Sequence, residues 1–184
     1  MSNFNDAWLS GFIDGEGSVG LTKSKETYIP TLQITTTCQK SCEYIIDVLI
    51  PIIGKIPSWS YQEKRPEIHR DSYYIRVTGM GRISKVIEAV LPYSITKKEH
   101  WELLKEFIKI RIELTGTDNK GNIKRGGKNR KPYGEREKEI YTELRAINRR
   151  GPRTEEYRKL HKNVYGQSNG NQQFTRKDFR VESS

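Results

Sequence analysis

The chain has 184 residues, a formal net charge of +10 and only 34% hydrophobic residues, which fits one domain of roughly 100–150 residues with an extension. The charge favours a polyanionic partner such as DNA or RNA, although alone it would also fit a membrane surface or a need for solubility. The sequence shows no long apolar segment, signal-peptide pattern or cysteine–histidine cluster, so we expect an intracellular protein without a membrane span, disulfide framework or zinc site.

The first predicted element is a short apolar helix that leads directly into an acidic turn. Residues 8–19 read W-L-S-G-F-I-D-G-E-G-S-V, and a strand-like segment follows at once. Gly11, with Ala7 and Ser10 beside it, gives the helix a flat face on which another backbone can pack closely. The apolar surface beside that face comes from Leu9, Phe12 and Ile13.

The acidic turn carries the first candidate for chemistry. Gly15 and Gly17 bracket Glu16, so the chain can turn there without a Cβ penalty. Because the helix dipole disfavours negative charge at a helix C-terminus, Glu16 needs a compensating cation. A hard divalent metal held by carboxylate and backbone oxygens would supply it. The alternative interpretation is a glycine-capped helix that ends in a solvated glutamate.

The next elements follow an alternating order. Residues 18–25 and 27–37 predict a pair of half-buried strands because apolar and polar side chains alternate along them. The rest of this core is predicted as a helix around 45–52 that Pro51 kinks or ends, strands at 56–64 and 71–78, a helix that stops at Pro92, and a helix over 96–114. The order αββαββα predicts an α+β core over residues 1–114, with one four-stranded antiparallel sheet backed by helices.

The C-terminal third has a different composition. Residues 115–134 predict a basic flexible loop, in which Lys128 and Arg130 are candidates for phosphate contact. Residues 135–184 predict a helical extension, with helices at 135–150 and 154–165 and a polar tail that we expect to be disordered. These charges fit either a solvated surface or a supplementary region that clamps DNA.

The polar face of the predicted sheet is the candidate for reading a DNA sequence, because a twisted β-ribbon fits the major groove. Gln33 can bind adenine and Arg76 can bind guanine through paired hydrogen bonds. Taken singly, each candidate also fits an ordinary exposed strand residue, so the set carries more weight than any member. The candidate DNA-binding residues of the sheet are Thr22, Gln33, Thr35, Ser60, Gln62 and Arg76.

Residues 9–17, L-S-G-F-I-D-G-E-G, resemble the nine-residue signature of the LAGLIDADG homing endonucleases, and the order of elements over residues 5–113 is similar to that family's core. The resemblance implies an enzyme that cuts both strands of a long pseudo-palindromic DNA site by metal-dependent phosphodiester hydrolysis and leaves staggered ends. Mg²⁺ is the implied cofactor, with two or three ions per dimer. One signature per chain implies a homodimer whose signature helices meet. The implied interface residues are Ala7, Leu9, Ser10, Gly11, Phe12 and Asp14.

The resemblance also implies the catalytic residues. Glu16 stands where the family's metal-binding acid ends the signature, and the Gly15 carbonyl is a further candidate ligand. Lys97 stands where many members place a lysine that could stabilise phosphoryl charge, with Lys98 as the competing register. Thr36 occupies the place of a glutamine that organises water in some members, and this departure leaves that role open.

Two other classes of protein remain as alternatives. The first is a non-cleaving binder with the same fold, either a maturase that binds intron RNA or a DNA-binding regulator. Glu16 argues against such a binder, whereas Thr36 and the basic extension favour it. The second is a basic structural protein, such as a ribosome-associated factor, whose acidic turn is coincidental. Metal-dependent cleavage that requires Glu16 would distinguish the enzyme from both.

Overall fold

The computed structural model describes residues 2–62, 71–116 and 131–148. A single antiparallel sheet of four strands forms the centre of this part of the chain, in the order β1-β2-β4-β3. Its strands are β1 (Gly17–Ser24), β2 (Thr27–Thr36), β3 (Ser58–Gln62) and β4 (Ser72–Thr78). The predicted α+β architecture with a four-stranded antiparallel sheet is confirmed.

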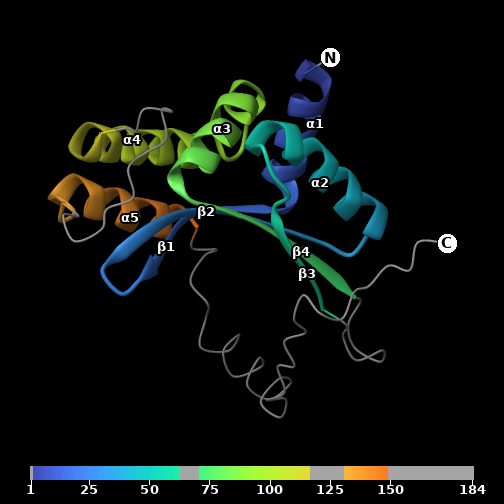
Figure 1. The fold of residues 1–184 in the computed structure, drawn as a ribbon, viewed down its shortest axis with the longest axis horizontal. Coiled ribbons are helices and arrows are strands. Elements are labelled where there is room, and N and C mark those ends of the chain that lie inside the picture. The colour runs from blue at the N-terminus through green and yellow to red at the C-terminus, as the bar shows by residue number, and fades with distance from the viewer. Residues whose placement is uncertain (1, 63–70, 117–130, 149–184) are drawn as a thin grey trace, which may run out of the picture. The chain divides into compact units, whose positions relative to one another are not determined.

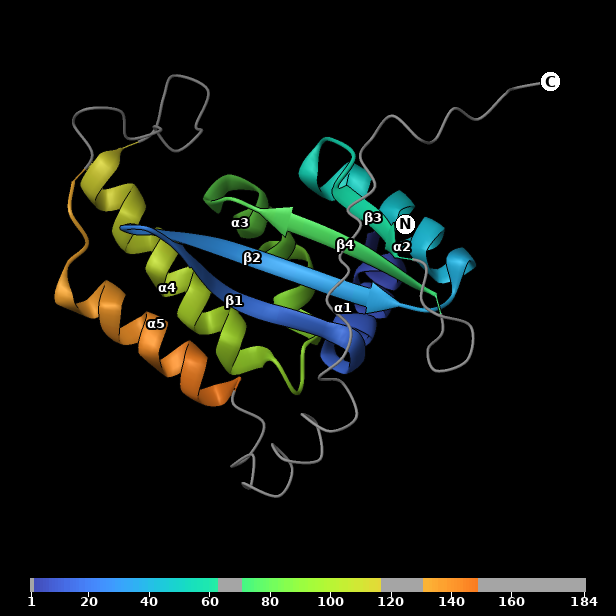
Figure 2. The same ribbon diagram turned by 90° about the horizontal axis from the view of Figure 1, so that it is seen from below.

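Helices cover only one face of this sheet (Figure 1). The helices on that face are α1 (Ser2–Glu16), α2 (Gln39–Ile53), α3 (Met80–Val90) and α4 (Lys98–Thr115), and a short 3-10 turn η1 (Leu91–Tyr93) lies between α3 and α4. In the view from below, turned by 90°, the sheet lies in front of these helices and no described helix covers it (Figure 2). We call this second face, which no described helix covers, the open face of the sheet.

Alternation along β2 separates the core from the open face. Tyr28, Leu32 and Ile34 are buried against the helices, and they meet large apolar side chains of α4, including Trp101 and Phe107, in one hydrophobic core. Residues at the alternate positions of β2 point to the open face. The face assignment made from the sequence is confirmed for this strand.

The junction between α1 and β1 differs from the predicted turn. The helix continues through Glu16 and the strand begins at Gly17, so no separate turn lies between them. Neither Gly15 nor Gly17 has a positive φ. Gly17 is required for another reason: a Cβ there would lie 2.7 Å from the backbone oxygen of Ile13. Close approach of the strand to the helix, and not turn geometry, explains this glycine.

Pro51 lies in the last turn of α2. The helix passes Pro51 and ends two residues later at Ile53. Gly54 ends it by adopting a left-handed conformation, with φ of 73°, and its N–H donates to the Ile50 carbonyl. A proline near the C-terminus interrupts only the last turn, so the glycine sets the end of the helix.

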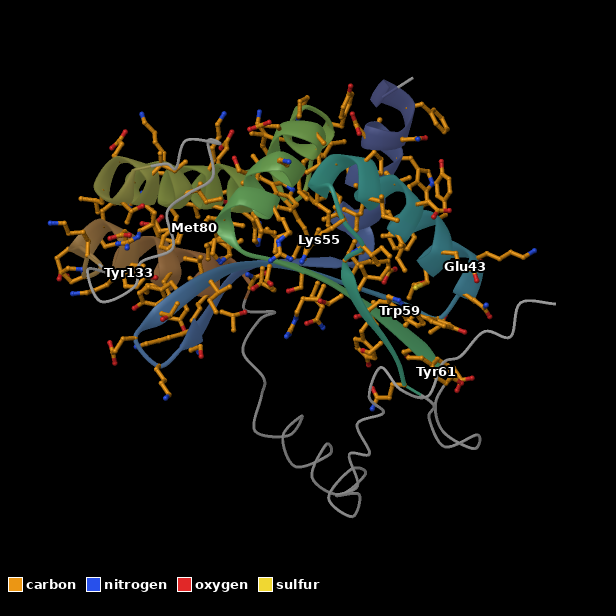
Figure 3. The ribbon with its side chains drawn as sticks, in the orientation of Figure 1. Glu43, Lys55, Trp59, Tyr61, Met80 and Tyr133 are labelled. Carbon is orange, nitrogen blue, oxygen red and sulfur yellow. The ribbon has the colours of Figure 1, made fainter. Side chains whose placement is uncertain are left out.

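A fifth helix, α5 (Glu135–Ile147), packs on the core. Its Ile140 and Leu144 are buried in the same hydrophobic core as the sheet. Figure 2 shows α5 beside α4, and Figure 3 shows Tyr133 at that end of the molecule. The sequence left open whether this region folds onto the core, and for α5 it does.

Several predicted features lie outside the described residues. They are the helix at 154–165, the polar tail, and the phosphate-contact candidates Lys128 and Arg130. None of the described helices combines the length and the apolar character that a membrane span requires.

Candidate active site and nucleic-acid interface

The motif helix α1 presents three different faces. Leu9 and Ile13 are fully buried in the hydrophobic core. Ser10 and Asp14, one helical turn apart, face the segment that follows α3. The third face is open and carries Phe4, Ala7, Trp8, Gly11 and Gly15, which recur at helical spacing and are exposed or half-buried.

The Ser10–Asp14 face ties α1 to residues 90–97. The Ser10 hydroxyl donates to the Val90 carbonyl at 3.0 Å, at the last residue of α3. The Asp14 carboxylate accepts four hydrogen bonds, from the hydroxyl of Ser94 and from the backbone N–H groups of the three residues after it. We call Asp14 and residues 94–97 the carboxylate clamp.

The clamp determines the charge of Asp14. Partial burial raises the pKa of this carboxyl, but the hydrogen bonds from Ile95 and the other clamp donors outweigh burial and hold the pKa below its ordinary value of 3.8. Consecutive backbone N–H groups that point at one anion form a nest, which favours the ionised form. Asp14 is therefore a carboxylate at neutral pH and its oxygens are occupied by the protein's own donors.

The clamp also places the predicted lysine. Lys97 precedes the first residue of α4, and its Nζ donates to the backbone oxygen of Asp14 at 2.8 Å. The amine therefore lies at the C-terminal end of α1, two residues before Glu16. Lys98 begins α4 and is exposed. Of these two lysines, Lys97 is the one whose amine contacts the motif helix in the described part of the chain.

The predicted metal ligands lie at the same end of α1. Glu16 is the last residue of the helix and is exposed, as is Gly15. Within the described residues, no group of three or more histidine, cysteine, aspartate or glutamate side chains could hold a metal ion. Glu16 supplies one hard carboxylate at this end of the helix, the oxygen type that a divalent metal prefers.

Thr36 lies close to this end of α1 but its hydroxyl has a local role. Gly17 pairs with Ile34, and β2 continues past that pair to Thr36. The Thr36 Oγ1 accepts a hydrogen bond from the N–H of Cys38 at 3.2 Å, which closes the turn into α2. The neighbouring Gln39 bonds to Glu43 on its own helix. The water-organising role considered for Thr36 stays a prediction.

The sheet register brings the strongest DNA-reading candidates into one row. Ser18, Gln33, Arg76 and Ser58 lie opposite one another on successive strands. The Arg76 Nη2 donates to Gln33 Oε1 at 3.0 Å, so these two side chains already form a pair. Ser18 is two residues after Glu16, and the row therefore begins next to the end of α1.

The other candidates occupy rows on the same open face. Thr35 and Ser60 flank Tyr74, whereas Thr22 lies toward the β1–β2 turn and Gln62 toward the far end of β3. The Thr22 hydroxyl donates to that of Thr31.

Sequence reasoning omitted several members of the open face. Counting by two from Arg76 gives Tyr74 and Thr78, and counting by two from Ser60 gives Ser58. The period-two pattern of β3 and β4 was therefore enough to find them. Tyr74 adds an aromatic ring to a face predicted from polar residues alone.

The predicted dimer surface stays a prediction, and its six residues differ in their contacts within one chain. Leu9 and Ser10 are 0% and 1% exposed, because the first lies in the core and the second bonds to Val90. Asp14 is occupied by the clamp. These three side chains face their own chain. Of the six predicted residues, Ala7, Gly11 and Phe12 remain at least partly accessible.

The open face of α1 contains apolar and glycine residues, of which Phe4 and the two glycines are exposed. Phe4 is 75% exposed, and Trp8 forms an aromatic group with Phe12 and Tyr44. A Cβ at Gly11 or Gly15 would meet no atom of the described residues within 4 Å. Glycine inside a helix costs about 1 kcal/mol relative to alanine. The described part of the chain gives no reason for that cost.

Comparison with known proteins identifies the fold of this chain through solved structures and not through sequence. No family model and no curated protein sequence matches the chain. Among solved structures, the homing endonuclease I-CvuI in complex with the I-CreI target is similar with a TM-score of 0.51 and 15% identity, over 89% of this chain and 96% of that chain.

Two further solved structures were found with lower scores. The LAGLIDADG meganuclease I-CpaMI bound to uncleaved DNA gives a TM-score of 0.48 and 18% identity, over 81% of this chain and 52% of that chain. The LAGLIDADG homing endonuclease I-GzeII in complex with its DNA target gives a TM-score of 0.46 and 17% identity, over 97% of this chain and 54% of that chain. The similarity to I-CvuI confirms the fold that the signature implied, so the chain has the fold of the LAGLIDADG homing endonucleases.

Proposed function

We propose that this protein is a LAGLIDADG homing endonuclease that acts as a homodimer and cuts both strands of a long pseudo-palindromic DNA site. One observation carries the proposal. The exposed carboxylate of Glu16 and the amine of Lys97, which donates to the Asp14 carbonyl, are both at the C-terminal end of α1, next to the first row of a polar sheet face that no described helix covers. The similar fold of I-CvuI, solved in complex with DNA, supports it.

Glu16 and Gly15 fit the oxygen chemistry of a divalent metal. Both are exposed at the end of a helix, where carbonyl oxygens and a carboxylate present negative charge. Mg²⁺ bound there would stabilise the attacking and leaving oxygens of an in-line displacement at phosphorus. Because one chain supplies one such carboxylate, the remaining ligands would come from a second Glu16 and from DNA phosphates.

Lys97 would act on the phosphate as a fixed positive charge. An ammonium group has three N–H donors, and the Asp14 carbonyl occupies one of them. The other two are available to the charge that develops on phosphate oxygens during cleavage.

The open face of α1 supports the dimer. Two copies of a helix can approach closely where glycine replaces larger side chains, and Gly11 and Gly15 lie in line on that face. Flanking aromatic side chains such as Phe4 would then lose their exposure to water. A two-fold axis through these helices would bring both Glu16 residues together and double the polar sheet into a surface for a pseudo-palindrome.

The proposal is tested with a randomised duplex library and purified protein in Mg²⁺, in parallel with the Glu16→Gln variant. Wild type should cut selected pseudo-palindromes and leave staggered ends. The variant should bind the same duplexes without cutting them, because the neutral glutamine amide lacks the negative charge with which a carboxylate holds Mg²⁺. Glu26→Gln, at the exposed β1–β2 turn, is the matched control and should cut like wild type.

Two results would overturn the proposal. Selective duplex binding without cutting by wild type would favour a DNA-binding regulator. Preference for structured intron RNA over duplex DNA would favour a maturase.

A further inference from the structure

We propose that Asp14 is a positioning residue for the proposed cleavage reaction, and that it acts by fixing Lys97. This inference rests on the proposed function, since it concerns the rate of the proposed cleavage. It assigns a role to a residue that is not among the proposed metal ligands. The implied role of Asp14 was at a dimer interface. Its contacts show instead a carboxylate used entirely within its own chain.

The first step of the argument is the completeness of the clamp. Oδ1 of Asp14 accepts from the Ser94 hydroxyl at 2.8 Å and from the Lys97 N–H at 3.2 Å. Oδ2 accepts from the N–H groups of Ile95 at 2.6 Å and Thr96 at 3.0 Å. Each oxygen therefore holds two donors, and the backbone of the whole segment is fixed relative to α1.

The second step is that the same segment carries the amine. Lys97 is bonded to Asp14 at both of its ends, since its N–H meets the carboxylate and its Nζ meets the backbone oxygen. The Thr96 hydroxyl also donates to that backbone oxygen at 3.1 Å. One residue of α1 thus sets both the backbone and the charged end of Lys97.

The third step is that packing alone would not hold this segment. Ile95 is 84% exposed, and Thr96 is exposed as well. Only Ser94 of this segment is buried. With so little apolar contact, the position of the segment depends on its hydrogen bonds to Asp14. A displacement of about 1 Å in a group that acts on the reacting centre can lower a rate by about 10²-fold.

The test substitution is Asp14→Asn, which keeps the size of the side chain. Whichever way the amide is oriented, its NH₂ group faces backbone N–H donors, and one side of the clamp opens. Asp47→Asn, at an exposed position of α2, is the matched control. Ser94→Ala removes a single donor and provides a milder variant if Asp14→Asn does not fold.

Two readouts are measured on the full-length protein. One is the single-turnover rate on a selected duplex, beside its dissociation constant. The other is acylation of Lys97 relative to Lys98 by an N-hydroxysuccinimide ester in the absence of DNA, measured by mass spectrometry. Lys98 is the internal reference because it is exposed and adjacent.

We expect Asp14→Asn to lower the cleavage rate by about 10²-fold with unchanged duplex affinity. The Lys97 to Lys98 acylation ratio should rise by about tenfold, as expected for loss of a hydrogen bond to a charged amine. Ser94→Ala should change both readouts in the same direction by less, and Asp47→Asn should change neither.

An unchanged acylation ratio in Asp14→Asn, or in Ser94→Ala if the first variant is unfolded, would overturn the inference. Equal losses of binding and cleavage with an unchanged ratio would instead assign Asp14 to the interface. If wild type cuts no duplex, the proposed function fails, while the acylation ratio still shows whether Asp14 positions the amine.

Discussion

Two polar clusters each join parts of the chain that are distant in sequence, and they stabilise their charged side chains in different ways. In the carboxylate clamp, Asp14 is satisfied by neutral donors of residues 94–97. Between α4 and α5, Arg111 and Glu137 form an ion pair at 3.3 Å and are only 2% and 1% exposed. We call this second cluster the arginine clasp. In the clasp the charges of two side chains cancel each other.

In the arginine clasp, several contacts besides the ion pair satisfy the buried guanidinium of Arg111. Arg111 also donates to the carbonyls of Lys131 and Pro132, and its guanidinium lies 4.5 Å from the ring centroid of Tyr133. Tyr133 in turn bonds the backbone of Tyr28. All of these contacts join α5 and its preceding residues to the core, and they leave no charge for a ligand.

The carboxylate clamp leaves a charge available. Because backbone N–H groups satisfy Asp14, no cation is consumed, and the amine of Lys97 meets only a carbonyl oxygen. The difference teaches that neutral donors can satisfy a carboxylate without using the charge of a neighbouring amine, which the proposed reaction would need.

Glu137→Ala should have the largest effect on stability, because it leaves the buried guanidinium of Arg111 without a counter-charge. We expect a loss of about 3–5 kcal/mol in the free energy of unfolding, measured by urea denaturation. Glu113→Ala, in the exposed pair with Lys109 on the same helix, should cost less than about 0.5 kcal/mol. A small effect of Glu137→Ala would show that the clasp does not hold α5.

Gly17→Ala should have the next largest effect, at the other end of the molecule. The new Cβ would lie 2.7 Å from both the oxygen and the Cγ2 of Ile13, so α1 and β1 would have to separate. We expect a loss of about 1–3 kcal/mol, as for other overpacked sites. Gly15→Ala meets no neighbour and is the control. Equal stabilities of the two variants would contradict close approach as the reason for Gly17.

Gly11→Ala should separate folding from association. Within one chain it should stabilise α1 by up to about 1 kcal/mol, because alanine is the better helix former and space is open. In the proposed dimer the added methyl group would hold the helices apart. Sedimentation equilibrium should therefore show weaker dimerisation of a more stable chain. Unchanged dimerisation would exclude this face of α1 as the interface.

The pH dependence should be the smallest effect, since Asp14 is only partly buried. Its pKa is lowered in the folded chain, so the clamp contributes its full stability above the ordinary value of 3.8 and loses it as the pH falls through the lower, folded value. Unfolding free energies measured between about pH 5 and 2 should fall more steeply for wild type than for Asp14→Asn. Parallel curves would mean that the clamp adds no stability.

Much of the fold was predictable because the alternation of apolar and polar residues along a strand assigns each residue to one face of the sheet. Tyr28, Leu32 and Ile34 define the inner face of β2, and the polar residues between them define the outer one. The inner face of α1 was not predictable in this way. Leu9 and Ile13 lie on one side and Phe4 and Trp8 on another, so the helix is apolar on both.

The two polar clusters show where sequence reasoning stops. The clamp joins residues that are 80 to 83 positions apart, and no local pattern relates them. The clasp had one signal: Arg111 continues the helical spacing of Leu104, Phe107 and Ile108 on the apolar side of α4. A charged residue in such a stripe predicts a buried partner but does not identify it as Glu137.

Alternation in the sheet has an evolutionary consequence. Along β2 and β4, each side chain on the open face has both sequence neighbours on the inner face, so the residues that would meet a ligand and the residues that build the core are separate sets. Mutations at Gln33, Tyr74 or Arg76 can therefore accumulate with little effect on folding. Such a surface can drift toward new binding preferences while the scaffold beneath it is inherited unchanged.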